Sequence, residues 1–320
     1  MSTPLVNERP DATRTPWAGP SPFRVVEELG IGAFFFACAA ITVLTTVGIV
    51  VVLGVETFQF FRVSGESPLG FLTGTDLEPE AIPPRFGILP LIWGTMVVAV
   101  GSSIIALPIG LLSAIFLSEY APRRVRSILK PVLELLAGIP TIVYGYLALL
   151  LVTPVIRWMV TPLGFSVETF NALSACVVVG IMVIPMVSSL SEDVLSAVPR
   201  GLREAGYGLG ATKFEVSTRI VLPAALSGVI SSFILAISRA IGETMAVVLA
   251  AGSRPQISLN LLTSIETMTA YIVGVASGEA AEGSAEALSL FAVGMTLFFI
   301  TLVFNLFSLV VLRRFRETYQ

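Results

Sequence analysis

Histidine is absent from the 320 residues, and charged residues make up only 13% of them. The first absence removes the most common transition-metal ligand and the most common general base in proteins. The second excludes an ordinary soluble domain, in which about 25% of residues are charged. Since 55% of the residues are hydrophobic, the composition predicts a polytopic membrane protein.

Cysteine and lysine are also scarce, with two residues of each. Cys38 and Cys176 both lie in apolar stretches, so we interpret them as small packing residues rather than a disulfide framework. Neither Lys130 nor Lys213 follows a glycine, and the phosphate-binding pattern GxxxxGK[ST] does not occur. The chain is therefore expected to hold no ATP, metal or other cofactor, to perform no catalysis and to bind no nucleic acid.

Six apolar segments are long enough to span a bilayer, for which a helix needs ~20 residues. The sequence therefore predicts an all-α, polytopic membrane protein with six transmembrane helices surrounded by lipid. We interpret Gly138 and Pro140, in the third segment, as the origin of a kink, although residues of a broken helix can also line a transport pathway. The segments cover about residues 30–60, 88–117, 131–155, 171–190, 223–251 and 287–312.

Lysine and arginine are unevenly distributed between the connecting segments. Fourteen of the 19 lie in the N-terminal tail, in the loops after the second and fourth segments, and at the C-terminus. Since basic loops face the cytoplasm, both termini are predicted to be cytoplasmic. The predicted organisation is a disordered cytoplasmic tail (1–29), a first transmembrane helix (30–60), an extracytoplasmic loop (61–86), a five-span domain (87–312) and a cytoplasmic C-terminus (313–320).

The predicted cytoplasmic loop 191–222 has local signals for two short helices. The first is expected over residues 200–207, and Gly208 and Gly210 would end it because glycine adopts the left-handed conformation without strain. The stretch TKFE, residues 212–215, has the spacing of a capping box, which begins a second helix. The loop is therefore predicted to form a helix–turn–helix on the cytoplasmic face.

The same loop carries a spaced motif. Glu204, Ala205 and Gly206 are followed after three residues by Gly210, and after nine more by IVLP at residues 220–223. This pattern resembles the EAA loop of ABC importer permeases, with Gly206 where alanine is usual. The resemblance implies the type I importer permease fold, and it implies that the first short helix couples the chain to a separate ATPase subunit. A glycine weakens a helix by up to ~1 kcal/mol, so Gly206 raises the question of how rigid this helix is.

Other stretches narrow the resemblance. ESPLGFLTG (66–74), FGILPLIWGT (86–95), GIPTIVYG (138–145) and SRAIGETMAV (238–247) are similar to the PstC-type permease subunits of phosphate-specific ABC importers, and the likeness covers about residues 30–312. The resemblance implies a bacterial plasma membrane and inorganic phosphate as substrate. It also implies three partners: a PstA-type permease subunit, two copies of a PstB-type ATPase that bind ATP and Mg, and an extracytoplasmic PstS-type phosphate-binding protein.

Two charges, Arg239 and Glu243, lie inside the fifth apolar segment. A charge at the bilayer centre costs on the order of 2.5–3.5 kcal/mol. On one continuous helix the two residues would share a face and form an ion pair, which could be purely structural. We favour a functional interpretation, in which the planar guanidinium of Arg239 faces the pathway and binds phosphate. Glu243 would then hold Arg239 when phosphate is absent and favour release.

Other interpretations stay open at this point. A permease for another anion, such as molybdate or sulfate, has the same fold, and the phrases quoted above favour phosphate over it. An ATPase-independent channel or secondary transporter is disfavoured by the EAA spacing, and a role in phosphate sensing is neither supported nor excluded. Among single residues, we interpret Glu134 as an interfacial or inter-subunit contact and Asn305 as a helix–helix hydrogen bond.

Overall fold

The computed structural model describes residues 22–278 and 280–315, with side chains from 28 to 311. The chain divides after Val52 into two compact units. Helix α1 (Pro22–Ser64) begins in the first unit, and no side chain in its most apolar window is buried. Within that unit α1 is thus an apolar helix with no protein partner.

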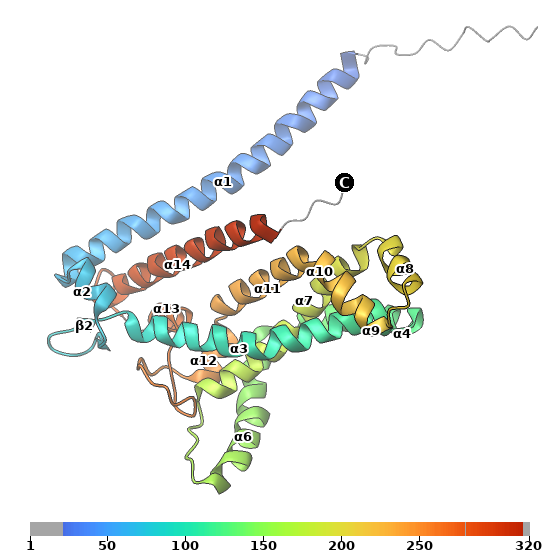
Figure 1. The fold of residues 1–320 in the computed structure, drawn as a ribbon. Coiled ribbons are helices and arrows are strands. Elements are labelled where there is room, and N and C mark those ends of the chain that lie inside the picture. Colours follow the sequence, from blue (N-terminus) through green and yellow to red (C-terminus); the bar gives the residue numbers. More distant parts are fainter. Residues whose placement is uncertain (1–21, 279, 316–320) are drawn as a thin grey trace, which may run out of the picture. The chain divides into compact units, whose positions relative to one another are not determined.

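The second unit, from Leu53 onward, is almost entirely helical (Figure 1). Its one sheet is a two-stranded antiparallel hairpin of β1 (Leu77–Glu78) and β2 (Arg85–Phe86). The helices of its first half are α2 (Pro68–Thr73), α3 (Leu89–Ile115), η1 (Phe116–Tyr120), α4 (Arg123–Ala137), α5 (Thr141–Leu147), η2 (Ala148–Val152), α6 (Thr153–Val160) and η3 (Thr161–Leu163). Those of the second half are α7 (Ala172–Ala197), α8 (Arg200–Gly208), α9 (Lys213–Glu215), η4 (Val216–Val221), α10 (Leu222–Ala224), α11 (Leu226–Ile241), α12 (Met245–Ala251), α13 (Met268–Ser277) and α14 (Ala285–Phe315).

Helices α3 and α7 pack along each other and form the centre of the second unit. Small residues allow the close approach, as is usual between transmembrane helices. A Cβ atom on Gly101 would lie 2.4 Å from the Cys176 sulfur, and one on Gly110 would lie 2.6 Å from the Val187 side chain. Cys176 is buried at this contact and forms no disulfide, which confirms its interpretation as a packing residue.

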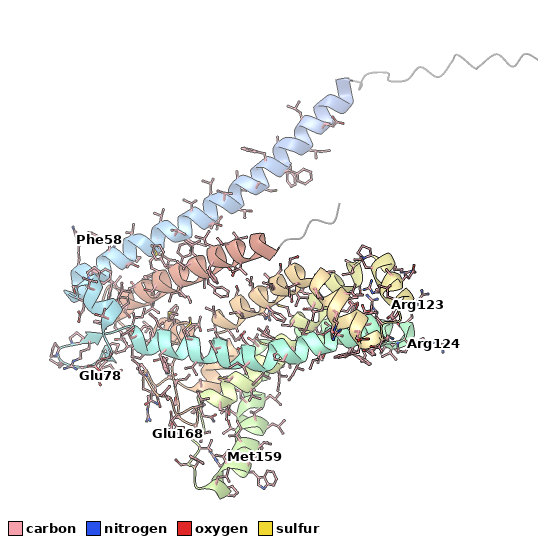
Figure 2. The ribbon with its side chains drawn as sticks, viewed as in Figure 1. Phe58, Glu78, Arg123, Arg124, Met159 and Glu168 are labelled. Carbon is pink, nitrogen blue, oxygen red and sulfur yellow. The ribbon has the colours of Figure 1, made fainter. Side chains whose placement is uncertain are left out.

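The two ends of the second unit differ in composition. At one end, which we call the hairpin end, α2, the β1–β2 hairpin and α13 lie together, and Phe60, Phe71 and Phe86 pack edge to face. The other end, called the α8 end, contains α4, α8 and α9. Figure 2 shows the basic residues Arg123 and Arg124 at the α8 end and the acidic Glu78 at the hairpin end.

Most of the predicted transmembrane segments are found as helices. Five helices are long and apolar enough to cross a membrane, and a bent pair makes a sixth candidate. Four of the five, at 28–64, 89–120, 172–197 and 285–311, match predicted segments. The first begins earlier than expected, because α1 starts at Pro22 within the predicted tail. The rest of that tail, residues 1–21, lies outside the described residues, as do residues 316–320 of the C-terminus.

The predicted third span at 131–155 was wrong at its start. Residues 123–137 form α4, a separate helix with no buried side chain, and the apolar span runs from Thr141 to Leu163. The chain breaks between them because Pro140 lacks an N–H group and disfavours helix at the preceding residue. The Gly138–Pro140 kink is therefore a complete helix break, and Glu134 is exposed on α4, where its predicted subunit contact stays a prediction.

The predicted fifth span at 223–251 was also wrong as a single helix. The helical segments 213–224 and 226–241 meet at an angle of 73°, so Pro223 ends the first rather than beginning the second. A second interruption separates α11 from α12 at residues 242–244. The two breaks could not be predicted from the apolar composition, which is continuous across them. The second break, at 242–244, is close to Arg239.

Candidate functional site

The interruption between α11 and α12 contains Glu243. This residue is 8% exposed, and its carboxylate oxygen Oε1 accepts a hydrogen bond from the backbone N–H of Ala246 at 3.2 Å. The hydroxyl of Thr269, in the first turn of α13, donates to the backbone carbonyl of Glu243 at 2.8 Å. Glu243 thus satisfies the start of α12 and is itself held by α13, as expected for polar backbone groups freed by a helix break.

The expected ion pair between Arg239 and Glu243 is not formed. Helix α11 ends at Ile241, so the two residues do not share a helix face, and the Glu243 carboxylate bonds to α12 instead. None of the ion pairs within the described residues involves Arg239. The purely structural interpretation of the pair is therefore wrong, and so is the idea that Glu243 holds Arg239 in this conformation.

Arg239 is instead an exposed cation in the last turn of α11, close to Tyr144 of α5. The adjacent Ser238 donates a hydrogen bond to Asn305 of α14 at 3.3 Å, which confirms the helix–helix role predicted for Asn305. Ala236 and Ala240 of the same helix are buried in the core. The guanidinium therefore extends from a well-packed helix, and it forms no ion pair with any described residue.

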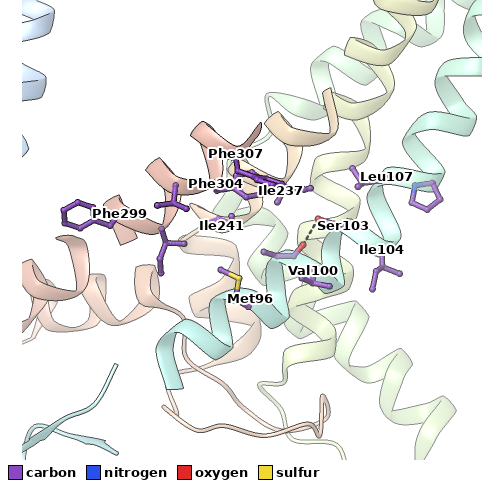
Figure 3. A pocket seen from close by; sticks show the side chains of 14 residues that line it. Met96, Val100, Ser103, Ile104, Leu107, Ile237, Ile241, Phe299, Phe304 and Phe307 are labelled. Carbon is purple, nitrogen blue, oxygen red and sulfur yellow. Dashed lines mark hydrogen bonds between the residues drawn. The ribbon is translucent and has the colours of Figure 1, made fainter. Parts of the chain in front are cut away.

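A cavity near Arg239 is lined by other residues (Figure 3). It has a volume of 890 Å³ and lies between α3, α11 and α14, where Ile237 and Ile241 but not Arg239 line it. Its single hydroxyl, on Ser103, already donates to the Ala99 carbonyl at 2.6 Å. A surface with apolar side chains and no free donor offers nothing to an anion, so this groove is excluded as a phosphate site.

The second candidate region is the spaced motif at the α8 end. The predicted helix–turn–helix is confirmed, since α8 ends before Gly210, whose φ of +82° is left-handed, and Thr212 forms a capping box with Glu215. Glu204 and Ala205 are exposed on α8. They are thus available to a partner, whereas the packing side of the helix is occupied within the chain.

Gly206 lies on the packing side, where α8 contacts η4. It is buried, and a Cβ atom there would lie 2.6 Å from the end of the Ile220 side chain and 3.0 Å from Val216. The departure from the usual alanine therefore permits a closer contact between α8 and η4. This contact holds α8 in place, which answers the question of rigidity raised by the glycine.

Arg203 ties α8 to the end of α3. Its guanidinium donates to both carboxylate oxygens of Glu119 at 2.9–3.3 Å, and to the carbonyls of Leu195 and Val198 at 2.8 and 2.5 Å. Both side chains of the ion pair are largely buried. Because bidentate pairs of this kind fix geometry as well as charge, α8, η1 and the end of α7 are held as one piece.

A second ionic cluster, not foreseen from the sequence, connects α4 to α7. The Glu192 side chain is completely buried and pairs with Arg126 and Lys130, while Ser196 donates to it at 2.8 Å. Burial lowers the pKa of Lys130, but hydrogen bonds to Asp193 and Glu192 outweigh this and raise it. The available signal was a glutamate at the end of an apolar segment, together with the basic residues of another loop.

Comparisons with known proteins identify the family. The family described as "Binding-protein-dependent transport system inner membrane component" matches residues 106–317. The probable ABC transporter permease protein YqgH of Bacillus subtilis is 34% identical over 84% of this chain and 86% of its own length. The phosphate transport system permease protein PstC of Xylella fastidiosa, strain Temecula1, is 39% identical over 73% of this chain and 75% of its own. The PstC protein of Mesorhizobium japonicum is 34% identical over 82% and 83%.

Solved structures agree on the fold. A bacterial alginate ABC transporter, in complex with an alginate-bound periplasmic protein, matches with a TM-score of 0.63, 15% identity and coverage of 93% of this chain and 100% of that one. The inward-facing MetNI methionine ABC transporter matches with a TM-score of 0.53, 16% identity and coverage of 72% and 95%. On the family match and the curated relatives together, this chain belongs to the binding-protein-dependent transport system inner membrane components, the membrane-spanning permeases of ABC importers.

Proposed function

We propose that this chain is the PstC-type permease subunit of an ATP-driven importer of inorganic phosphate. The main structural evidence for phosphate as the substrate is Arg239. This cation lies beside an intramembrane helix break, and no carboxylate of the described residues neutralises it. A guanidinium matches two phosphate oxygens with parallel hydrogen bonds. Relatives over 30% identical that carry the name PstC support phosphate rather than another anion.

In this proposal Arg239 binds phosphate directly and Glu243 positions the pathway. The break at 242–244 turns the chain away from α11 after Arg239, and Glu243 stabilises the break by capping α12. Broken helices commonly border the substrate sites of transporters, because only there is irregular backbone tolerated at membrane depth. Permeases for sulfate or molybdate would share this architecture, so the choice among anions depends on the relatives.

The rest of the complex follows from the same proposal. A PstA-type subunit completes the pathway, and two copies of a PstB-type ATPase bind ATP and Mg. A PstS-type binding protein delivers phosphate from outside. The α8 end, with its basic loops, faces the cytoplasm together with both termini. There Tyr207, Leu209 and Phe214 are exposed, as are Glu204 and Ala205, and we assign them to the face offered to the ATPase. An ATPase-independent channel would have no use for this face.

Uptake of labelled phosphate by liposomes that contain the whole complex tests the proposal. We expect ATP-dependent uptake that requires the binding protein and is not inhibited by excess sulfate or molybdate. Uptake without ATP would favour a channel instead. Uptake of sulfate or molybdate but not phosphate would contradict the substrate and retain the ABC importer assignment.

Replacing Arg203 with glutamine is expected to lower phosphate transport per ATP hydrolysed. Arg203 connects α8 to η1 and α7, so its loss lets α8 move without moving the transmembrane helices. Residues along such a connection change coupling by about 0.5–2 kcal/mol, which corresponds to a loss of up to about 30-fold. The measurement is the ratio of phosphate imported to ATP consumed in liposomes.

The matched control for Arg203 is Arg124→Gln, which removes an exposed arginine at the same end (Figure 2). We expect this variant to keep the wild-type ratio. An Arg203→Gln complex with a wild-type ratio would show that the Arg203–Glu119 pair is not part of the coupling.

A further inference from the structure

A polar pocket of 630 Å³ opens at the hairpin end. It is formed by the β1 strand and the turn after it, the loop between α12 and α13, α13 itself, and the first turn of α14. Figure 2 shows Glu78 at this end of the unit. Every charged residue in its lining is a glutamate, and these are Glu78, Glu80, Glu266 and Glu286.

Glu266 distinguishes this pocket from an ordinary acidic surface. It is 7% exposed, lines the pocket, and makes no hydrogen bond or ion pair with any described residue through its carboxylate. Burial raises the pKa of the Glu266 carboxyl to about 7. A buried carboxylate without a partner is costly unless something else supplies the counter-charge.

The two arginines next to the lining segments, Arg85 and Arg254, are engaged with other carboxylates. Arg85 pairs with Asp76 at 2.8 Å, and Arg254 lies 3.5 Å from Glu168. The hydroxyl of Tyr271, which lines the pocket, is bonded to Ser289 at 2.7 Å. Within residues 28–278 and 280–311, therefore, no cation is placed against Glu266, and a counter-charge that keeps its carboxylate ionised would come from another molecule.

The spacing of the glutamates in the pocket favours the cation of a long side chain over a metal ion. No group of three His, Cys, Asp or Glu among the described residues is close enough to hold a metal ion. The glutamates are spread over separate segments, with apolar residues such as Leu77, Pro255 and Val275 between them. This arrangement suits a long side chain whose aliphatic stem lies on apolar surface while its charged head reaches a carboxylate, as in lysine or arginine.

The side of the membrane on which the pocket lies indicates which partner supplies the cation. The pocket lies at the opposite end from α8, and the proposed orientation places it outside the cytoplasm, where the binding protein required by this family arrives. We propose that the pocket receives a lysine or arginine side chain of the extracytoplasmic binding protein, with Glu266 as the carboxylate at its base. This inference rests on the proposed function for the orientation and for the identity of the partner.

The base of the pocket is also close to the helix break beside Arg239. Glu266 immediately precedes Thr267, the N-cap of α13, and Thr269 in the first turn of α13 donates to the Glu243 carbonyl. The carbonyl of Glu266 lies against Gly94 of α3, where a side chain would not fit. A cation that binds Glu266 therefore acts on a segment that is packed directly against the pathway helices.

The test measures how much binding protein the complex needs. The complex in lipid nanodiscs is titrated with its phosphate-loaded PstS-type binding protein, and both direct binding and stimulated ATP hydrolysis are recorded. Glu266→Gln is expected to raise the half-saturating concentration about tenfold or more, with the maximal rate retained, because it removes one partner of a buried charge pair. The control, Glu282→Gln, removes an exposed glutamate outside the pocket and is expected to change it less than twofold.

The pH dependence provides a second readout. Glu266 loses its proton between about pH 6 and 8, so the half-saturating concentration of the wild type should fall over this range. The other titratable groups that face it are Glu78, Glu80, Tyr271 and Glu286. The Glu266→Gln complex keeps these groups and the same binding protein, so the part of the pH dependence that it loses belongs to Glu266.

A Glu266→Gln complex with wild-type half-saturation and wild-type pH dependence would overturn the proposal. If that variant does not assemble, the wild type decides, since a half-saturating concentration that does not change between about pH 6 and 8 would also overturn the proposal. Binding is recorded separately from phosphate uptake. A wild-type complex that binds the protein but imports no phosphate would contradict the proposed function and leave the result for the pocket intact.

Discussion

Replacing Arg239 with glutamine is expected to reduce phosphate import at least about a hundredfold while the complex still assembles. A guanidinium can make two charge-assisted hydrogen bonds to phosphate, each contributing about 1.5–3 kcal/mol. Their loss is large because no other described residue provides a cation beside the break at 242–244. Assembly should be retained because Arg239 makes no ion pair in the described part of the chain. The measurement is labelled phosphate uptake at matched complex levels.

Two further variants serve as controls for the Arg239→Gln result. Arg239→Lys keeps the charge but loses the planar fork, so we expect transport between that of wild type and Arg239→Gln. Arg62→Gln removes an exposed arginine that lies over the Phe58 ring at 4.6 Å, and it should transport normally. Wild-type transport by Arg239→Gln would place the phosphate site elsewhere in the complex.

Replacing Glu192 with alanine is expected to destabilise the complex by about 3 kcal/mol. Removing one partner from a buried ion pair costs about 3–5 kcal/mol, because the remaining charges lose their counter-charge. The low end of the range applies here, since the Arg126 and Lys130 side chains are 39% and 25% exposed and can turn toward water. The measurement is the thermal unfolding of the purified complex in detergent, at one detergent concentration.

The neighbouring Asp193 is the matched control for this variant. Asp193 also pairs with Lys130, but its side chain is 56% exposed. Asp193→Asn is therefore expected to cost less than about 1 kcal/mol, as exposed ion pairs do. Equal destabilisation by the two variants would mean that the burial of Glu192 does not set its contribution.

Much of the fold could be predicted from local properties of the sequence. Apolar length identified four spans closely, because a helix that crosses lipid must satisfy its backbone internally and be apolar throughout. The two short helices at 200–208 and 213–215 were predicted because capping and left-handed glycine depend only on adjacent residues. The spacing of Glu204, Gly206 and Gly210 also pointed to the family that the comparisons later showed.

The error in the fifth segment came from contacts between residues distant in sequence. The fifth segment reads as one apolar run, yet it is bent near Ala225 and interrupted at 242–244. The interruption at 242–244 is stabilised by Thr269, which is distant in sequence, and by the hydrogen bond that the Glu243 carboxylate accepts from the Ala246 N–H. Sequence spacing alone therefore predicted an Arg239–Glu243 pair that the structure does not form.

The sequence by itself determined the class of protein, the number of apolar segments, the EAA-like motif and the candidate cation Arg239. These depend on composition and on residues a few positions apart. The tertiary structure alone decided that Arg239 and Glu266 have no ion pair among the described residues, that Glu192 is buried between two basic side chains, and that Glu266 lines an acidic pocket. Each of these depends on burial and on charges from distant segments, because the free energy of an ionised side chain is set by what surrounds it in space.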